Sequence, residues 1–197
     1  MAEIVVIKER NGVEPGSDTA LTNITARFCT IDAAQPGTSN PCKVPTSNFY
    51  YSYWKSLFAD VSGTGWTSIR DIKWYCDGTT ADSWGLDKAN GGGMVIGKRD
   101  TGDNGCPQAN YDQALGDPGN TGYFIGDPIN GHTWYYQQAT PTKNADDCTA
   151  SSPHLIDSTV YTAAFQSKFW LIQIKIPPTA AHGELTAKTH TITYQVY

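Results

Sequence analysis

The chain has 197 residues, of which 17% are charged, against roughly 25% in an average globular domain, and its formal net charge is −5. A mildly acidic chain without a Lys/Arg cluster repels phosphate backbones, which argues against general nucleic-acid binding. No apolar run reaches the roughly 18 residues that a membrane-spanning helix requires. The many glycines (19) and prolines (11) are typical of short strands joined by turns.

The first part of the chain predicts several strands. Residues 3–8 form the first, and residues 19–30 alternate between apolar and polar side chains with the period of two that a half-buried strand shows. Residues 33–47 contain three prolines and predict a long loop. Residues 49–61 are apolar or aromatic on both faces, which indicates a central strand covered on both sides. Residues 66–76 alternate again and predict the next strand.

The middle of the chain, residues 77–160, is rich in Gly, Asp, Asn, Thr and Pro, and predicts ordered loops. Short strands are expected at 93–98, 121–125 and 132–138. The best candidate for a short helix is 107–115. Long loops in a compact domain usually carry a binding or assembly role.

The last part predicts two long strands, at 168–176 and 185–197, separated by Pro177-Pro178 and a short connector. The alternation and the turn spacing together predict an all-β chain. We therefore expect residues 1–197 to form one β-sandwich domain, jelly-roll-like or Ig-like, with long Gly/Thr/Asn-rich loops and at most one or two short helices.

The five cysteines are an odd number, so at least one is unpaired within the chain. Cys29 with Cys42 could close a loop, and so could Cys106 with Cys148. Isolated thiols, in the core or in loops, are the alternative for all of them, Cys76 included. No CxxC occurs, and no Cys/His pair has the spacing of a zinc site.

Motifs that would carry catalysis are absent from the sequence. It contains no GxSxG elbow, no phosphate-binding glycine loop and no HExxH. The run Gly91-Gly92-Gly93 precedes a strand rather than a helix and indicates a turn. We therefore expect no enzymatic activity, no cofactor and no metal.

One loop resembles half of a calcium site. Asp100, Asn104 and Gly105 match the first, fifth and sixth positions of an EF-hand, but the twelfth position is Tyr111 instead of a bidentate Glu. An EF-hand is therefore rejected. A calcium site of another kind, made of loop oxygens, and a cluster of Asx turns are the two alternatives that stay open.

The sequence is unusually aromatic, with six tryptophans and 11 tyrosines. Four of these rings lie on or near predicted loops and are candidates for stacking against the faces of sugars: Trp66, Trp84, Tyr135 and Tyr136. The alternative is that such large rings fill the core and the contacts between subunits.

Several stretches look familiar together: SNFYYSYWKSLFADVSG, IRDIKWYCDG, GGGMVIGKRDTGDNGCP, NTGYFIG and the closing THTITYQV. They resemble β-rich proteins of tailed viruses and prokaryotes. Some of those are similar to capsid decoration or head-fibre components of virions, and others to subunits of surface filaments. The resemblance spans the chain from about residue 3 to its end and brings no functional residues with it.

Three functions follow as hypotheses. The first is a capsid decoration or cement protein on the virion surface, with copies of itself and a capsid protein as partners. The second is an extracellular filament or pilus subunit, in which residues 1–10 leave their own domain and Ile4, Val5, Val6 and Ile7 complete a neighbour's sheet; an ordinary edge strand is the alternative there. The third is a secreted carbohydrate-binding module. The N-terminal MAEIVVIKER lacks the features of a signal peptide.

Overall fold

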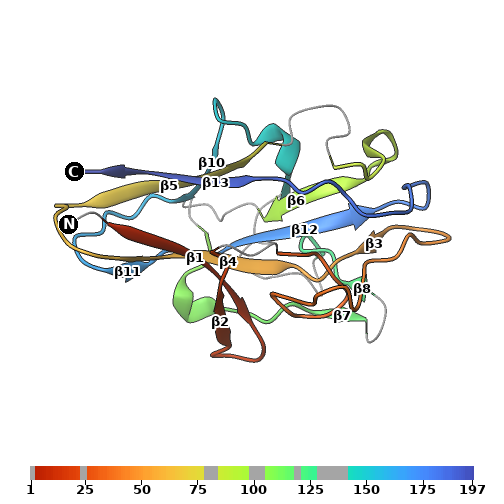
Figure 1. Cartoon of the computed structure of the whole chain (residues 1–197), viewed down its shortest axis with the longest axis horizontal. Coiled ribbons are helices and arrows are strands. Elements are labelled where there is room, and N and C mark those ends of the chain that lie inside the picture. The colour runs from red at the N-terminus through yellow and green to blue at the C-terminus, as the bar shows by residue number, and fades with distance from the viewer. Residues whose placement is uncertain (1–2, 23–25, 78–83, 98–104, 118–120, 128–141) are drawn as a thin grey trace.

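The chain folds into two antiparallel sheets and a small third ribbon (Figure 1). The structure is a computed structural model and describes residues 3–22, 26–77, 84–97, 105–117, 121–127 and 142–197. These parts of the chain contain no α-helix, only three single-turn 3₁₀ segments: η1 (Lys88–Asn90), η2 (Gln108–Asn110) and η3 (Ala145–Asp147). The predicted all-β, sandwich-like fold is confirmed.

The larger sheet has eight strands in the order β2-β1-β4-β12-β6-β9, with β11 also paired to β4 and β3 to β12. Its strands are β1 (Ile4–Asn11), β2 (Ser17–Ala20), β3 (Tyr50–Tyr51), β4 (Lys55–Ser62), β6 (Gly93–Gly97), β9 (Thr142–Asn144), β11 (Phe165–Gln166) and β12 (Trp170–Ile176). The longest ladder joins β1 to β4, from Ile4 opposite Ser62 to Arg10 opposite Ser56.

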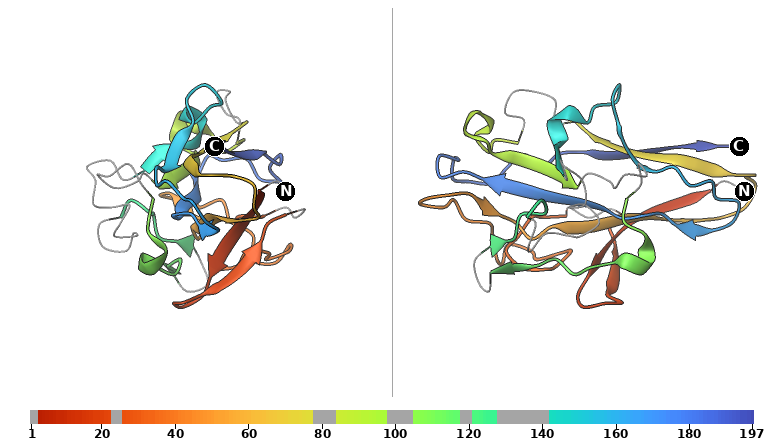
Figure 2. Two further views of the ribbon diagram at one scale, coloured as in Figure 1. Left: turned by 90° about the vertical axis from the view of Figure 1, so that its left-hand side faces the viewer. Right: turned by 180° about the vertical axis from the view of Figure 1, so that it is seen from behind.

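The smaller sheet packs over one face of the larger one. Its order is β10-β5-β13, with β10 (His154–Asp157), β5 (Ile69–Cys76) and β13 (His190–Val196). On the other side lies a ribbon of β7 (Gly116–Asp117) and β8 (Thr121–Gly122). Figures 1 and 2 show β5 and β13 above, β12, β4 and β1 in the middle, and β7 and β8 below.

The alternation of side chains along β4 explains the layers. Leu57 and Val61 point to the face that carries the smaller sheet, whereas Trp54 and Phe58 join a second apolar cluster on the opposite face. All of these side chains are at most 4% exposed. The prediction of a central strand covered on both faces is therefore confirmed for β4, but the single strand expected over 49–61 is interrupted at residues 52–54 and divided into β3 and β4.

The lower layer is held to the sheet by a buried amide. Gln173 of β12 is fully buried, and its Nε2 donates to the carbonyl oxygens of Ser52 (2.7 Å) and Tyr123 (2.6 Å). Its Oε1 accepts a hydrogen bond from the backbone N–H of Ile125 at 3.1 Å. A close backbone approach adds to this, because a Cβ on Gly122 would lie 2.0 Å from the Ser52 oxygen. One polar residue thus satisfies three buried backbone groups at once.

Some predicted elements differ from the structure. A strand over 19–30 was wrong: β2 ends at Ala20, because it pairs with only the last four residues of β1 and the chain then leaves the sheet. The helix at 107–115 is the single turn η2. The closing strand begins at His190 instead of 185.

Two further strand predictions fall in the middle of the chain. The strand expected at 121–125 is only the two-residue β8, because the chain turns toward Gln173 beyond it. The strand expected at 132–138 lies outside the described residues.

Candidate functional site

A large, partly open pocket of about 1150 Å³, called the cavity below, lies between the two sheets and the loops along one side. Its volume exceeds the roughly 300–1,000 Å³ of ordinary ligand pockets. The larger sheet and the smaller sheet both contribute inward-facing side chains. The walls of the cavity include Ile7, Leu57, Trp170, Ile172, Ile174 and Ile176 from the larger sheet, and Trp74, His190 and Ile192 from the smaller one.

The cavity exists because loops, and not a further strand, close one side of the sandwich. Residues 26–28 and 36–44 come from one long connection, and residues 180–188 from another; both lie along the rim. Arg27 and Glu184 form an ion pair of 2.7 Å that ties the two loops together over the cavity. Because both side chains are well exposed, this link contributes little stability and can open at low cost.

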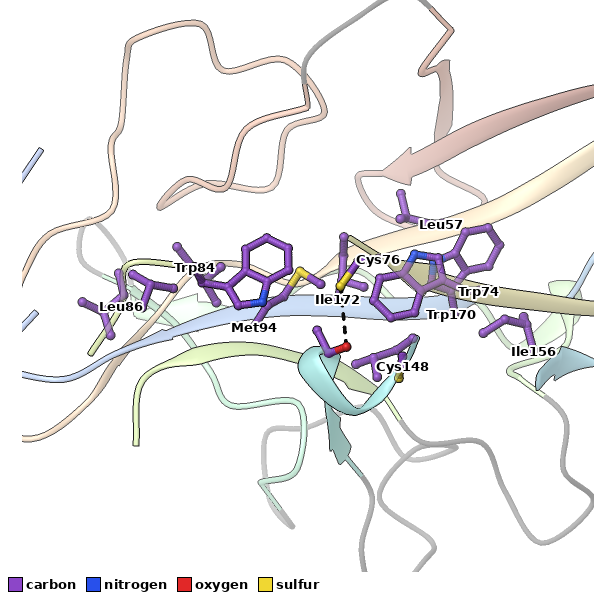
Figure 3. Packing of buried hydrophobic residues seen from close by; sticks show 14 of the residues in the cluster. Leu57, Trp74, Cys76, Trp84, Leu86, Met94, Cys148, Ile156, Trp170 and Ile172 are labelled. Atoms are coloured by element: carbon purple, nitrogen blue, oxygen red, sulfur yellow. Dashed lines mark hydrogen bonds between the residues drawn. The ribbon is translucent and has the colours of Figure 1, made fainter. Parts of the chain in front are cut away.

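Two buried tryptophans of the cavity wall have polar atoms without a partner. Trp74 is fully buried and Trp170 is 1% exposed, and among the described residues neither indole Nε1 has a hydrogen-bond acceptor. Figure 3 shows both rings in the apolar cluster with Leu57 and Ile172. A buried N–H that has lost water without gaining an acceptor is costly, and since both nitrogen atoms are fully covered by the packed core, this cost belongs to the core and not to the open part of the cavity.

The cavity wall also carries a buried ion pair. Lys55 Nζ lies 3.1 Å from Glu9 Oε1 and 3.2 Å from Oε2, and it donates to the carbonyl oxygen of Ala33 at 3.1 Å. The side chains of Lys55 and Glu9 are 4% and 1% exposed. The two charges neutralise each other, so the pair adds no net charge to the cavity.

His190 is the remaining ionisable group deep in the site. Its ring contacts Trp74 and Trp84 edge-on, with ring centroids 5.4 Å and 6.1 Å apart. Burial lowers the pKa of His190 from 6.5 to about 4, and the negative charge of Asp77 only partly opposes this effect. The imidazole is therefore neutral at pH 7 and adds no charge to the cavity wall.

The structure does not place the predicted sugar-stacking rings on an open surface. Trp84 is only 7% exposed, and its Nε1 donates to Asp146 Oδ1 at 3.0 Å. Trp66 is half-buried and packs edge-on against Phe165, with ring centroids 6.5 Å apart. Tyr135 and Tyr136 lie outside the described residues. Trp84 is therefore largely covered by its own domain, whereas stacking by Trp66 stays a prediction.

The predicted exchanging strand lies in its own domain. Ile4, Val5, Val6 and Ile7 all pair with β4 of the same chain. β1 is not a simple edge strand either, because β2 covers its outer side from Lys8 onward. Among the described residues, no strand pairs with the outer side of Ile4, Val5 and Val6.

One end of the molecule is markedly apolar. Four of the eight large apolar side chains that are exposed in the described parts of the chain gather there: Ile4, Val160, Val196 and Tyr197. Ile4 is opposite Ser62 at the end of β4, whereas Val196 is opposite Ile69 at the start of β5. Figure 1 shows both termini at this end. We refer to these four residues as the apolar end.

The cysteines are all free thiols in this structure. Cys106 and Cys148 lie in clusters on opposite faces of the larger sheet, so of the two alternatives that the sequence left open for them, the structure has separate thiols and not a disulfide. Cys29 and Cys42 do lie close together, because the backbone of Cys29 forms an isolated β-bridge with Pro41. Burial raises the pKa of the Cys42 thiol to about 12, and the nearby Cys29 contributes to this rise. Cys76 is buried, with its thiol toward the carbonyl of Ala145 (Figure 3).

Metal-binding clusters and membrane-spanning helices are both absent from the described parts of the chain. No group of three or more His, Cys, Asp or Glu side chains with metal-binding geometry occurs in the described ranges. The calcium-like loop lies largely outside them, since residues 98–104 are not described. Within those same ranges, no helix has the length and apolar character needed to cross a membrane.

Comparisons with protein-family models, with curated proteins and with solved structures find no match. Sequence reasoning missed both the cavity and the buried ion pair. The alternation of β4 and β12 pointed to the inward-facing residues, but alternation carries no information on how far apart two sheets lie or what closes the gap between them.

Proposed function

We propose that the protein is a non-enzymatic structural component of a surface assembly, of the capsid-decoration type, whose copies join through β13 and the apolar end. The observation that carries the proposal is the open edge of β13. Its residues 190–196, HTITYQV, include no Lys, Arg, Asp, Glu or Pro. Proteins normally place such residues on edge strands to prevent pairing with other chains.

The geometry of this edge suits a second copy of the same chain. β13 pairs with β5 on one side, and among the described residues no strand covers its other side. A register shift between Thr193 and Gln195 interrupts the ladder but leaves His190–Thr193 regular. Two such strands can pair antiparallel about a two-fold axis, because an isologous contact presents the same residues from both sides.

The apolar end gives this contact a hydrophobic component. Val196 belongs to β13 itself and is 42% exposed, and the neighbouring Ile4 and Tyr197 are 58% and 56% exposed. Burying these side chains against a second copy removes apolar surface from water. Clusters of exposed apolar side chains on otherwise polar molecules commonly mark interaction surfaces.

The capsid as the site of assembly is supported by the resemblance to virion decoration proteins. Donor-strand exchange, the filament hypothesis, has less support, because Ile4–Ile7 would have to leave β4 and the neighbouring Glu9–Lys55 ion pair would be disturbed. The carbohydrate-binding hypothesis has less support, because one of its four candidate rings, Trp84, is only 7% exposed. Reinforcement by surface contact requires no catalytic group, which agrees with the absence of catalytic motifs from the sequence.

The test measures molar mass in solution by size-exclusion chromatography with light scattering over a range of concentrations. The wild-type protein should exceed the 21.4 kDa of one chain, and the double variant Ile4→Lys/Val196→Lys should return to that mass. Val13→Lys is the matched control, because Val13 is 76% exposed and lies away from the apolar end, in the β1–β2 turn.

A wild-type protein that stays at 21.4 kDa up to its solubility limit would contradict the proposal. Equal disruption by Val13→Lys would show that added charge, and not the apolar end, is responsible. Antibody labelling of purified source particles in the electron microscope then tests the capsid location, which fails if the label is found on filaments or is absent from particles.

A further inference from the structure

The inference concerns three polar side chains of the larger sheet: Glu9 and Asn11 of β1 and Lys55 of β4. The β1–β4 ladder ends with Arg10 opposite Ser56. One step further along the same register, Asn11 is opposite Lys55, and side chains directly opposite each other in an antiparallel pair leave the same face of the sheet. Glu9, two positions before Asn11, points to that face as well. The register therefore gathers an amine, a carboxamide and a carboxylate at one place.

A single carboxylate oxygen contacts both of the other groups. Oε1 of Glu9 lies 3.1 Å from Lys55 Nζ and accepts a hydrogen bond from Asn11 Nδ2 at 2.9 Å. Asn11 Nδ2 also donates to Asp32 Oδ1 at 2.6 Å, and Asp32 accepts a hydrogen bond from the backbone N–H of Gly12 at 2.7 Å. The amide of Asn11 is thus held in one orientation, with its nitrogen beside the carboxylate that also binds the amine.

Water has little access to the amine and the carboxylate. Lys55 is 3% exposed and Glu9 is fully buried, whereas Asn11 is half-buried. A charge removed from water in this way is costly even when an opposite charge compensates it. Transfer of one proton from Lys55 to Glu9 replaces the two buried charges by a neutral amine and a neutral acid. The neutral amine has the free electron pair that a nucleophile requires, and the Asn11 carboxamide is an electrophile held by the same carboxylate.

We propose that Lys55 and Asn11 join in an isopeptide bond within the chain, with Glu9 as the group that transfers the protons. Lys55 Nζ begins with three protons: one passes to Glu9, one goes to the departing nitrogen of Asn11, and one stays on the new amide. The Nζ–Cγ bond forms, the Cγ–Nδ2 bond breaks, and the nitrogen leaves as ammonia. The reaction consumes no oxidant or cofactor, and Glu9 ends as a neutral acid. The structure shows the three side chains before this reaction.

The bond clamps the first strand of the chain to the centre of the larger sheet. It closes a loop from residue 11 to residue 55, and a covalent link of this kind restricts the unfolded chain as a disulfide does. β1 then stays tied to β4 even when the ladder between them opens, which agrees with a strand that remains in its own domain. The inference does not rest on the proposed assembly, because the bond forms within a single copy of the chain.

The test is the intact mass of the full chain, measured by mass spectrometry on unfolded protein, both freshly purified and after prolonged incubation. The mass of the incubated protein should lie below the mass calculated from the sequence by one molecule of ammonia. Trypsin does not cleave after a lysine whose Nζ is acylated, so the chain should stay uncut after Lys55. The digest should contain a branched peptide in which residues 11–27 are joined to residues 44–70.

Variants identify the groups that react. Asn11→Ala and Glu9→Gln should each keep the full mass of their own sequence, because the first removes the electrophile and the second removes the group that transfers the protons. Asn11 is half-buried, so Asn11→Ala disturbs less of the core and decides the question if Glu9→Gln does not fold. Lys8→Met is the matched control: Lys8 lies on the opposite face of β1 and pairs with Asp60, and its loss should leave the ammonia deficit unchanged.

A wild-type chain that keeps the full sequence mass after incubation would overturn the proposal. Loss of ammonia without a branched peptide would do the same, since Asn11 and Gly12 can close a succinimide ring with an equal change in mass. Loss of water instead of ammonia would place the bond at Asp32 and not at Asn11. Chain at the full sequence mass retains the Glu9–Lys55 ion pair, and stability comparisons of that pair apply to this form. The molar mass in solution tests the assembly separately, so failure of one proposal is distinguishable from failure of the other.

Discussion

The buried ion pair between Lys55 and Glu9 offers the sharpest test of the packing in this fold. Lys55→Met keeps the aliphatic stem and removes the charge, which leaves the Glu9 carboxylate buried with the side-chain amide of Asn11 at 2.9 Å as its remaining side-chain partner. Removing one member of a buried pair typically costs about 3–5 kcal/mol, because the other charge remains uncompensated. Such a loss is a large fraction of the about 5–15 kcal/mol that stabilises an ordinary domain.

The measurement is urea unfolding followed by tryptophan fluorescence, with the free energy of unfolding extrapolated to water. Two further variants are compared with Lys55→Met. Glu9→Gln/Lys55→Met removes both charges and should recover most of the loss. Lys8→Met breaks the pair with Asp60, whose side chains are 26% and 32% exposed, and should cost less than about 1 kcal/mol. The reasoning is refuted if Lys55→Met is no more harmful than Lys8→Met, or if the double variant is as unstable as the single one.

Three other predictions address different parts of the molecule. The pKa of His190 is about 4 in the folded protein and 6.5 in the unfolded chain, so the unfolded chain takes up the proton first as the pH falls. Between pH 6.5 and pH 4, the free energy of unfolding of the wild type should therefore fall by about 1–3 kcal/mol relative to that of His190→Asn. A constant difference between the two proteins across this range would contradict the burial argument. Gln173→Ala should lower the free energy of unfolding by about 2–4 kcal/mol, because three backbone groups lose their hydrogen-bond partner. Backbone amides of the β7–β8 layer should also exchange hydrogen faster than in the wild type. Unchanged protection of these amides would show that Gln173 does not hold this layer to the sheet. Oxidation by diamide at alkaline pH, which offsets the raised pKa of the Cys42 thiol, should link Cys29 to Cys42 and should leave Cys106 and Cys148 without a disulfide, as alkylation after unfolding and peptide mapping by mass spectrometry check; a Cys106–Cys148 link would conflict with their places on opposite faces of the sheet.

The parts of the fold that follow from local alternation were predictable, and the parts that follow from long-range placement were not. The two faces of β4 and β12 could be assigned because neighbouring side chains along a strand point to opposite sides. The end of β2 at Ala20 depends on where β1 stops offering a partner, which the alternation of residues 19–30 does not contain. Glu9 and Lys55 are 46 positions apart, and only the register between β1 and β4 brings them together.

The cavity also depends on long-range placement that local alternation does not predict. Its walls include residues that a sequence reader would assign to an ordinary core, such as Leu57, Ile172 and Trp170, and these residues are at most 4% exposed and pack in one cluster with Trp74 of the opposite sheet. The pocket beside them depends on the two loops at its rim. Arg27 and Glu184 join those loops, but they lie near opposite ends of the sequence, so no local pattern predicts that they meet.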